Sequence, residues 1–249
     1  MSYASALDEY EELLAAEVKH RTHTKILGYY PDDGPLRREL YPKHLSFFAL
    51  GTQHSERMFM AGNRTGKTTV GCFETVLHAT GRYQQYAPWW TGKRYDRPIS
   101  CIVAGDTNLT TRDILQSKLF GKLERQPGDN LREAIGLGTG MMPRDAILQA
   151  TPRRGAENAY EEVTIRHISG GVSVIKLRSY EQKREAFQGT EEDWIWLDEE
   201  FPAEVYSECL TRLMTTQGSF ICTFTPLSGV SAIIREFMEK AYRPHELPY

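Results

Sequence analysis

Short apolar runs recur along the middle of the chain, and most are followed by a segment with helical spacing. The runs typical of buried strands are ERMFMAG, PISCIVAGD, WIWLDEE and SFICTFTP. KTTVGCFETVLHAT follows the first, and TNLTTRDILQSKLFG, which begins with a helix-capping threonine, follows the second. SAIIREFMEKAY predicts a closing helix. Strands that alternate with helices favour an α/β fold with a mostly parallel sheet flanked by helices, in which ligands bind at the carboxyl ends of the strands.

Two further segments have patterns of their own. VTIRHISGGVSVIKLRSY alternates apolar and polar positions on both sides of Gly170 and Gly171, which predicts a β-hairpin. Residues 121–160 are rich in glycine, proline and charge, and we predict that they are mostly loop. The stretch GLGTG within them resembles part of a dinucleotide fingerprint, but it follows no strand, so we interpret it as loop.

The N-terminal part has a different character. Residues 5–20 place apolar side chains at helical spacing, and residues 29–50 form a proline- and glycine-punctuated connector that ends in a short helix. We therefore expect a small N-terminal helical or lid subdomain at 1–50, a core at 51–242 and the start of a linker at 243–249.

Composition narrows the class of protein. The 249 residues are 40% hydrophobic and 25% charged, which is typical of a globular protein with a sizeable core. No apolar run approaches the roughly 20 residues of a membrane helix, and the N-terminus lacks a secretory signal, so we expect no membrane contact. With a net charge of -3, any contact with nucleic acid is expected to be a local patch or to belong to a part of the protein outside this sequence. The four cysteines lack metal-site spacing and are expected to be free, buried thiols.

MAGNRTGKTTVG is typical of a phosphate-binding loop. Gly66, Lys67 and Thr68 match the end of the pattern Gly-x₄-Gly-Lys-Ser/Thr, with a strand before the loop and a helix after it. The first glycine is displaced, because Ala61 holds its position and Gly62 follows, so we expect Gly62 to supply the turn with a shifted bend. Lys67 is predicted to reach the β- and γ-phosphates, and Thr68 to hold Mg²⁺ through its hydroxyl.

DWIWLDEE supplies the carboxylates that such a site needs. Asp198 follows a buried strand and is the expected Mg²⁺ partner, and Glu199 is placed to activate the attacking water as a general base. The alternative is a strand that simply emerges into solvent with acids at its end. No Asn-Lys-x-Asp pattern for guanine is present, which favours ATP.

TFTP ends the next strand. Thr225 could sense hydrolysis and pass it on to the surface that moves, but an ordinary strand end with a turn-starting proline explains the same residues equally well.

Taken together, these pieces resemble the ATPase region of the large terminase subunits of tailed bacteriophages, the motors that package DNA. MAGNRTGKT, FETVLHATGRY with WW shortly after, TTRDILQ, SYEQKREAFQGTEEDWIWLDEE and TFTP follow the family's order over roughly residues 45–240. The resemblance implies a RecA-like (ASCE) P-loop ATPase with Walker A from Gly62 to Thr68, Walker B ending at Asp198, Glu199 as the catalytic glutamate and TFTP as the coupling motif.

The resemblance also implies which side chains bind ATP and Mg²⁺. An arginine in the loop is typical of the family, so Arg64 is expected near the phosphates, in a catalytic role. Adenine is read in relatives by a glutamine or aromatic residue before Walker A, and Gln53 is the one glutamine in FFALGTQHSERMFM. The expected nucleotide-binding residues are Gly62, Asn63, Arg64, Thr65, Gly66, Lys67, Thr68, Thr69, Gln53 and Thr225, and the expected metal ligands are Thr68 and Asp198.

Related motors use an arginine from a neighbouring subunit to stabilise the transition state. Relatives carry it just before a glycine about nine residues ahead of the Walker B aspartate, where this sequence has Gln188 and Gly189. Arg184 is therefore our first candidate and Arg112 the second. Either could instead be an ordinary surface arginine.

By resemblance, the chain is expected to translocate double-stranded DNA into a procapsid with a portal protein, a small terminase subunit and further copies of itself, as a homo-oligomeric ring that is pentameric on the portal. It would work in the host cytoplasm, docked transiently on the portal, and would be absent from the mature virion. Relatives carry a C-terminal nuclease whose acidic cluster we do not find, so no DNA cleavage is expected. Two alternatives are another ASCE ATPase, such as a helicase, and a non-catalytic scaffold with a degenerate site.

Overall fold

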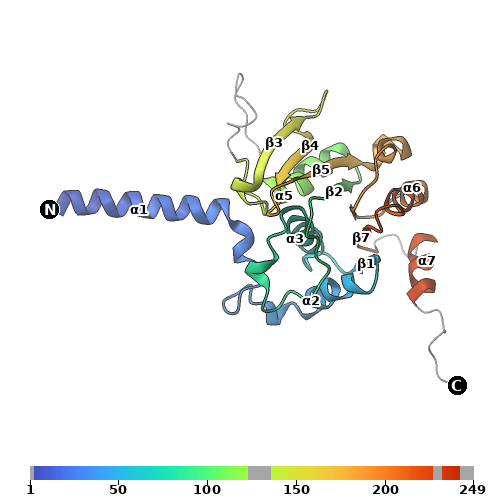
Figure 1. Cartoon of the computed structure of the whole chain (residues 1–249), viewed down its shortest axis with the longest axis horizontal. Helices are drawn as coiled ribbons and strands as arrows, with labels where there is room; N and C mark the ends of the chain where they lie inside the picture. The colour runs from blue at the N-terminus through green and yellow to red at the C-terminus, as the bar shows by residue number, and fades with distance from the viewer. Residues whose placement is uncertain (1–2, 123–135, 227–231, 242–249) are drawn as a thin grey trace.

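The fold is organised around one seven-stranded sheet. The computed structural model describes residues 3–122, 136–226 and 232–241. The strand order is β1-β7-β6-β2-β5-β4-β3; the first five are parallel, and the pairs β5–β4 and β4–β3 are antiparallel. The mostly parallel sheet predicted from the sequence is confirmed (Figure 1). The strands are β1 (Glu56–Met60), β2 (Ser100–Gly105), β3 (Ile147–Pro152), β4 (Tyr160–Arg166), β5 (Val172–Ser179), β6 (Trp194–Asp198) and β7 (Ser219–Phe224).

The central strands bury side chains on both faces because successive residues of a strand point to opposite sides. In β6, Trp194 and Trp196 belong to one core cluster, whereas Ile195 and Leu197 belong to a second. A fully buried strand therefore has a continuous apolar run, which is the pattern of WIWL in the sequence.

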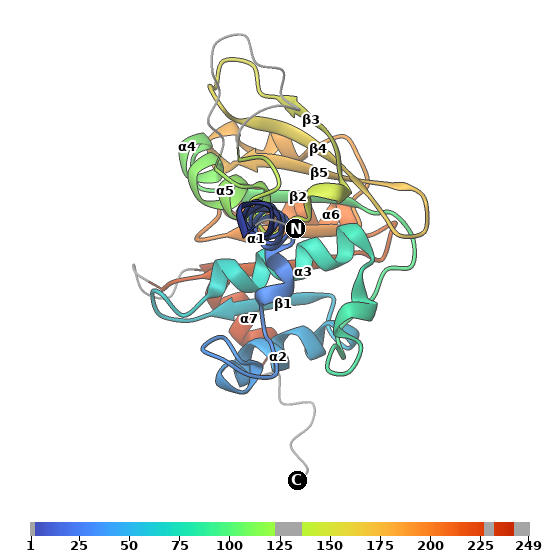
Figure 2. The same cartoon turned by 90° about the vertical axis from the view of Figure 1, so that its left-hand side faces the viewer.

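Helices cover both faces of the sheet. α3 (Lys67–Thr80) lies on the face of the tryptophans, and α6 (Ala203–Leu213) packs on the opposite face, with α7 (Ala232–Ala241) beside it (Figures 1 and 2). The other helical elements are α1 (Tyr3–His23), α2 (Pro42–Ala49), α4 (Asn108–Thr110), a π-helical stretch (Thr111–Gln116) and α5 (Ser117–Phe120).

α3 packs unusually close to the sheet. Gly71 faces the indole of Trp196, and any side chain added at Gly71 would collide with that ring. Because α3 begins directly at the phosphate-binding loop, this close approach also fixes the height of the loop above the sheet.

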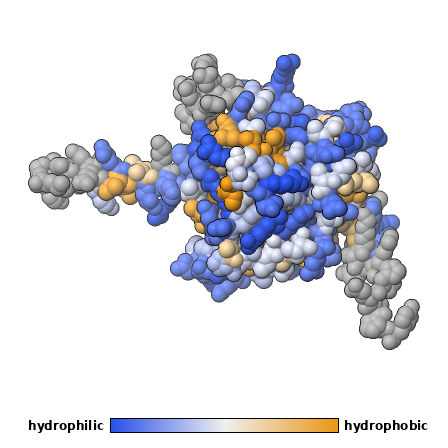
Figure 3. Space-filling view, in the orientation of Figure 1, coloured by the Kyte–Doolittle hydropathy of each residue, from blue (hydrophilic) through white to orange (hydrophobic). Residues whose placement is uncertain are grey.

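The N-terminal segment has two parts with different surroundings. α1 projects away from the body (Figure 1), and Leu13, Leu14 and Val18 on it are exposed, giving apolar patches on the projecting helix (Figure 3). Four side chains of the following segment, in contrast, are buried in one core with α3: Ile26, Tyr30, Phe47 and Phe48. The ring of Tyr30 meets the ring of Phe73 of α3 edge-on, with centroids 4.9 Å apart. No helix in the described part of the chain is long and apolar enough to cross a membrane.

The prediction that residues 121–160 are mostly loop holds for the described residues among them, but it missed one strand. β3 lies within them and forms the edge of the sheet, beside β4, while residues 123–135 and the predicted linker at 243–249 lie outside the described residues. Only Ile147 and Ala150 of β3 are buried, and the strand ends in Pro152, which an edge strand tolerates. The sequence therefore lacked a clear strand pattern.

The predicted hairpin is present as β4 and β5, and the predicted cap as Thr107, whose hydroxyl accepts from the backbone of Thr110. The four cysteines are free and buried, as expected.

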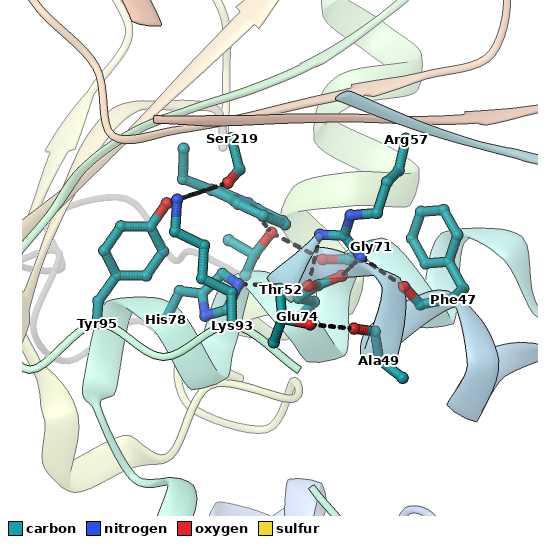
Figure 4. Close-up of polar contacts among 12 residues, drawn as sticks. Phe47, Ala49, Thr52, Arg57, Gly71, Glu74, His78, Lys93, Tyr95 and Ser219 are labelled. Carbon is teal, nitrogen blue, oxygen red and sulfur yellow. Dashed lines mark hydrogen bonds and ion pairs between the residues drawn. The ribbon is translucent and has the colours of Figure 1, made fainter. Parts of the chain in front are cut away.

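A buried ion pair joins β1 to α3. The Arg57 guanidinium donates to both carboxylate oxygens of Glu74, at 2.7 and 3.2 Å, and to the carbonyl of Phe47 at 2.7 Å (Figure 4). His78 Nε2 lies 3.4 Å from the same carboxylate, and its Nδ1 is 2.6 Å from the Tyr83 hydroxyl. Burial alone would raise the pKa of Glu74, but the charge of Arg57 and the contact with His78 outweigh it and lower that pKa.

We expect Glu74→Gln to lower the free energy of unfolding by about 3 kcal/mol or more, because it leaves the Arg57 charge buried without its counter-ion. Chemical denaturation at neutral pH measures this. Since the pKa of Glu74 is lowered in the fold, its stabilisation exists above the unfolded pKa and is lost as the pH falls through the folded one. The free energies of unfolding of Glu74→Gln and the parent chain should thus become more similar below about pH 4.3.

A matched control is Asp145→Asn, which removes a carboxylate that pairs with Arg82 at 2.5 Å but is largely exposed. It should cost about 1 kcal/mol or less. Equal losses for the two variants would contradict a special contribution from the buried pair.

Candidate nucleotide site

The phosphate-binding loop runs from the carboxyl end of β1 to the first turn of α3. Two of its residues have left-handed backbone, Arg64 with φ of 60° and Gly66 with φ of 86°. Gly62 does not have a positive φ, and a Cβ there would meet nothing, so the expectation that Gly62 supplies a shifted bend is wrong. The turn is made at Arg64 and Gly66, and the displaced first glycine is therefore no obstacle to the loop.

Gly62 contributes through its carbonyl. That oxygen accepts from the buried Lys67 ammonium at 2.8 Å and from the Thr65 hydroxyl at 2.8 Å. Lys67 thus lies folded back over the loop, where the backbone N–H groups at the start of α3 also point. An ammonium and free N–H groups around one concave loop suit an anion with several oxygens.

Asp198 lies at the carboxyl end of β6, across from this loop. Its carboxylate accepts from the Thr68 hydroxyl at 3.3 and 3.4 Å and also from the Thr223 hydroxyl. The parallel register places Asp198 beside Thr223 of β7, and the Tyr180 hydroxyl donates to the Asp198 carbonyl at 2.8 Å. Burial, together with the neighbouring charge of Glu199, raises the pKa of Asp198 to about 6, against the lowering effect of its hydrogen bonds.

Thr68 and Asp198 fit a magnesium ion. Mg²⁺ is bound in such sites by one or two protein oxygens, with water and phosphate completing the shell. A buried carboxylate whose pKa is raised is stabilised in its charged form by a cation. No cluster of three or more His, Cys, Asp or Glu side chains occurs among the described residues, so this pair is better suited to a metal–phosphate complex than to a metal held by protein alone.

Glu199 has a left-handed backbone, with φ of 64°, which is costly for a residue with a side chain. Its backbone N–H donates to the Thr223 carbonyl at 2.7 Å, and its carboxylate accepts from the Thr225 backbone N–H at 3.2 Å and from the Thr225 hydroxyl at 3.4 Å. The residue is half-buried. Thr225 is therefore in direct contact with the residue predicted to be the general base.

A cavity of about 710 Å³ opens on the other side of the loop. It is lined by residues of the 59–69 stretch, by Tyr29 and Tyr41 from the segment between α1 and α2, and by Lys43 from the first turn of α2. Aromatic and aliphatic walls next to a phosphate-binding loop suit a planar base.

His44 holds the loop against this cavity. Its Nε2 lies 2.9 Å from the Thr65 carbonyl, which can only accept, so Nε2 carries the proton. Burial lowers the pKa of His44, the ring is therefore neutral, and its Nδ1 accepts from the Tyr30 hydroxyl at 2.9 Å. A side chain at Gly66 would approach the His44 ring closely, so the histidine and the glycine fit each other.

The structure does not bring Gln53 to the site. Gln53 is exposed, precedes β1 at the amino end of the strand, and does not line the cavity, which lies at the carboxyl end. Asn63 and Arg64 are exposed on the loop, and Arg64 lines the cavity.

The two arginine candidates lie outside the loop. Arg184 pairs with Glu208 of α6 at 3.1 Å and has a side chain that is 56% exposed. Arg112 pairs with its neighbour Asp113 and donates to the Glu157 carbonyl at 3.1 Å.

Three residues of the site were not singled out from the sequence. Thr223 could have been found, since it is two residues from Thr225 and in register with Asp198. His44 and Lys118 come from segments with no motif, and only tertiary packing brings them to the loop. Lys118 Nζ donates to the Thr69 hydroxyl at 2.9 Å.

Comparison with known proteins identifies the family of this chain. Residues 58–246 match the family described as terminase large subunit, T4likevirus-type, N-terminal. The terminase large subunit of Salmonella phage P22 is 30% identical over 242 residues, which covers 92% of this chain and 45% of that protein.

Solved structures show the same fold at low sequence identity. The large terminase of the HK97 bacteriophage has a TM-score of 0.57 at 12% identity, covering 91% of this chain and 42% of that one. The large terminase of a thermophilic bacteriophage has a TM-score of 0.52 at 14% identity, covering 90% of this chain and 43% of that one. The chain thus spans less than half the length of these relatives. The family match over most of its length shows that this chain belongs to the terminase large subunits and corresponds to their N-terminal region.

Proposed function

We propose that this chain is the ATP-hydrolysing motor region of a phage terminase large subunit and that hydrolysis drives double-stranded DNA into a procapsid. The observation that carries the proposal is that Lys67 and Thr68 lie near Asp198 and Glu199 at the carboxyl ends of the central strands. Family membership gives this site its context.

Each side chain has a role that follows from its place. Lys67 binds the β- and γ-phosphates after exchanging the Gly62 carbonyl for a phosphate oxygen. Thr68 and Asp198 hold Mg²⁺, which neutralises phosphate charge when bound. Glu199 accepts a proton from the attacking water. The cavity beside Tyr29 and Tyr41 takes the adenine, the role that Gln53 is too distant to fill.

Thr225 links the chemistry to the rest of the molecule. Its backbone N–H and its hydroxyl both donate to the Glu199 carboxylate. When Glu199 turns to orient the attacking water, these contacts change, and Thr225 can pass the change on to the end of β7. Arg64, at the rim of the cavity, is placed to contact the phosphates.

The partners are part of the proposal. We infer that the chain assembles into a homo-oligomeric ring, pentameric on the portal, and acts with the portal protein and the small terminase subunit in the host cytoplasm. A ring lets an arginine of one copy reach the nucleotide of the next. The exposure of Arg184 is consistent with this.

Lys67→Ala should abolish nucleotide binding or reduce it by at least about 100-fold, because the charge-assisted contacts to two phosphates are lost. Titration calorimetry with Mg·ATP measures the affinity. Lys43→Ala is a control on a lysine at the edge of the same cavity, and we expect a much smaller effect. Unchanged affinity in Lys67→Ala would contradict the proposed site.

Glu199→Gln should bind Mg·ATP with near-normal affinity and hydrolyse it at least about 100-fold more slowly, since the amide cannot accept the water's proton. Steady-state phosphate release and nucleotide titration together test this. Glu200→Gln, which alters the exposed neighbouring acid, should leave turnover unchanged. Normal turnover in Glu199→Gln would remove it from the role of base.

Arg184→Ala and Lys67→Ala should each be inactive in the assembled ring, yet mixtures should recover activity. The Arg184→Ala subunits keep a nucleotide site and the Lys67→Ala subunits keep the arginine, so a shared interface is complete. ATPase assays with portal present, over a range of mixing ratios, detect this recovery. Wild-type activity of Arg184→Ala alone would exclude Arg184, and Arg112→Ala would then be tested in the same way.

A further inference from the structure

Lys118 lies beside the phosphate-binding loop but belongs to a different element. It is part of α5, in the helical segment that follows β2, and its ammonium donates to the Thr69 hydroxyl at 2.9 Å. Thr69 is in the first turn of α3 and lines the cavity of the site. Lys118 therefore approaches the start of α3 from outside the loop, where Lys67 approaches it from within.

The backbone around Lys118 is fixed on both sides. The Lys118 carbonyl accepts from the Met141 N–H at 2.8 Å, and Leu119 and Phe120 are fully buried. Gln116, two residues earlier, is buried and binds the Asn158 carbonyl and the Tyr160 N–H, each at 2.7 Å. The Cα of Lys118 thus has a set position, while its half-buried side chain keeps the freedom of a four-carbon stem.

The charge of Lys118 is not neutralised by any carboxylate among the residues that the structure describes. It forms no ion pair within that set, whereas Lys176, also half-buried, pairs with Glu192 at 2.7 Å. Its one side-chain hydrogen bond there goes to a neutral hydroxyl. A partly desolvated ammonium at a helix N-terminus that already favours anions suits a phosphate oxygen.

We propose that Lys118 is a second cation of the nucleotide site. When nucleotide binds, the Lys118 ammonium exchanges its hydrogen bond to the Thr69 hydroxyl for one to a phosphate oxygen at the start of α3. This inference rests on the proposed nucleotide binding and deepens it. Two lysines from two elements then clamp the phosphates, and binding connects α5 to α3 through the ligand.

The test is the affinity for Mg·ADP of the parent chain, Lys118→Met, Lys118→Arg and Lys122→Met. Lys118→Met keeps the length and apolar stem but removes the charge, so the affinity should fall about tenfold or more. Lys118→Arg should stay within about threefold of the parent, because it keeps the positive charge. Lys122 lies four residues further on and is exposed, so Lys122→Met should bind like the parent. Thermal unfolding without nucleotide should be unchanged in all variants, while the rise in Tm on adding Mg·ADP should be reduced in Lys118→Met.

The outcomes separate this inference from the function on which it rests. Lys118→Met that binds Mg·ADP like the parent overturns the role of Lys118 and leaves the nucleotide site in place. A weakened Lys118→Met that is not rescued by arginine and has a lowered Tm without nucleotide also overturns it, in favour of a structural contact. Failure of the parent chain to bind Mg·ADP would overturn both proposals.

Discussion

The register of β7 with its two neighbours is the constraint on which the site depends. β7 lies between β1 and β6, pairing Phe224 with Met60 on one side and Thr223 with Asp198 on the other. These pairings bring the end of β1, which leads into the phosphate-binding loop, level with the end of β6, which supplies the acids. A shift of one residue in either pairing would turn the facing side chains to the other side of the sheet. The hydrogen bond between Thr68 and Asp198 is possible only because both registers hold.

The carboxyl ends of β1 and β6, and the loop between β1 and α3, also contain several features that are costly for folding. A carboxylate is buried, a glutamate has left-handed backbone, and a lysine is buried against a carbonyl. Each is costly in isolation, because burial penalises a charged group and a side chain disfavours left-handed backbone. The surrounding structure compensates through two apolar cores and the Arg57–Glu74 pair, which joins β1 to α3 directly behind the loop. The residues that stabilise the fold are thus different from the residues of the candidate site.

Much of the fold could be predicted from the sequence, because short continuous apolar runs indicate buried strands and longer segments with helix-forming residues follow them. The central strands and α3 were found in this way, although nearly all of α3 is buried. β3 was missed because an edge strand buries few side chains, and α6 was missed although Val205, Cys209 and Leu213 recur every four residues and lie buried in the second core. The helix α6 could therefore have been predicted from its local sequence pattern, whereas β3 is a strand only because it pairs with β4.

The candidate site divides in the same way. Lys67, Thr68, Asp198 and Glu199 could be predicted because each follows or precedes a strand whose end is fixed by topology. Gln53 was misplaced although its position before β1 already puts it at the amino end of the strand, opposite the loop that follows β1. His44 and Lys118 depend on packing between distant segments, and the left-handed turn at Arg64 is not indicated by residue type, because arginine rarely adopts it.

The contact between Gly71 and Trp196 ties catalytic geometry to a position that no ligand touches. A methyl group at Gly71 would push α3 outward. The hydroxyl of Thr68, three residues earlier in the same helix, would move with it. The spacing between Thr68 and Asp198 therefore depends on how closely α3 approaches the Trp196 indole. A variant at this glycine could fold, keep every side chain of the pocket and still lose its chemistry.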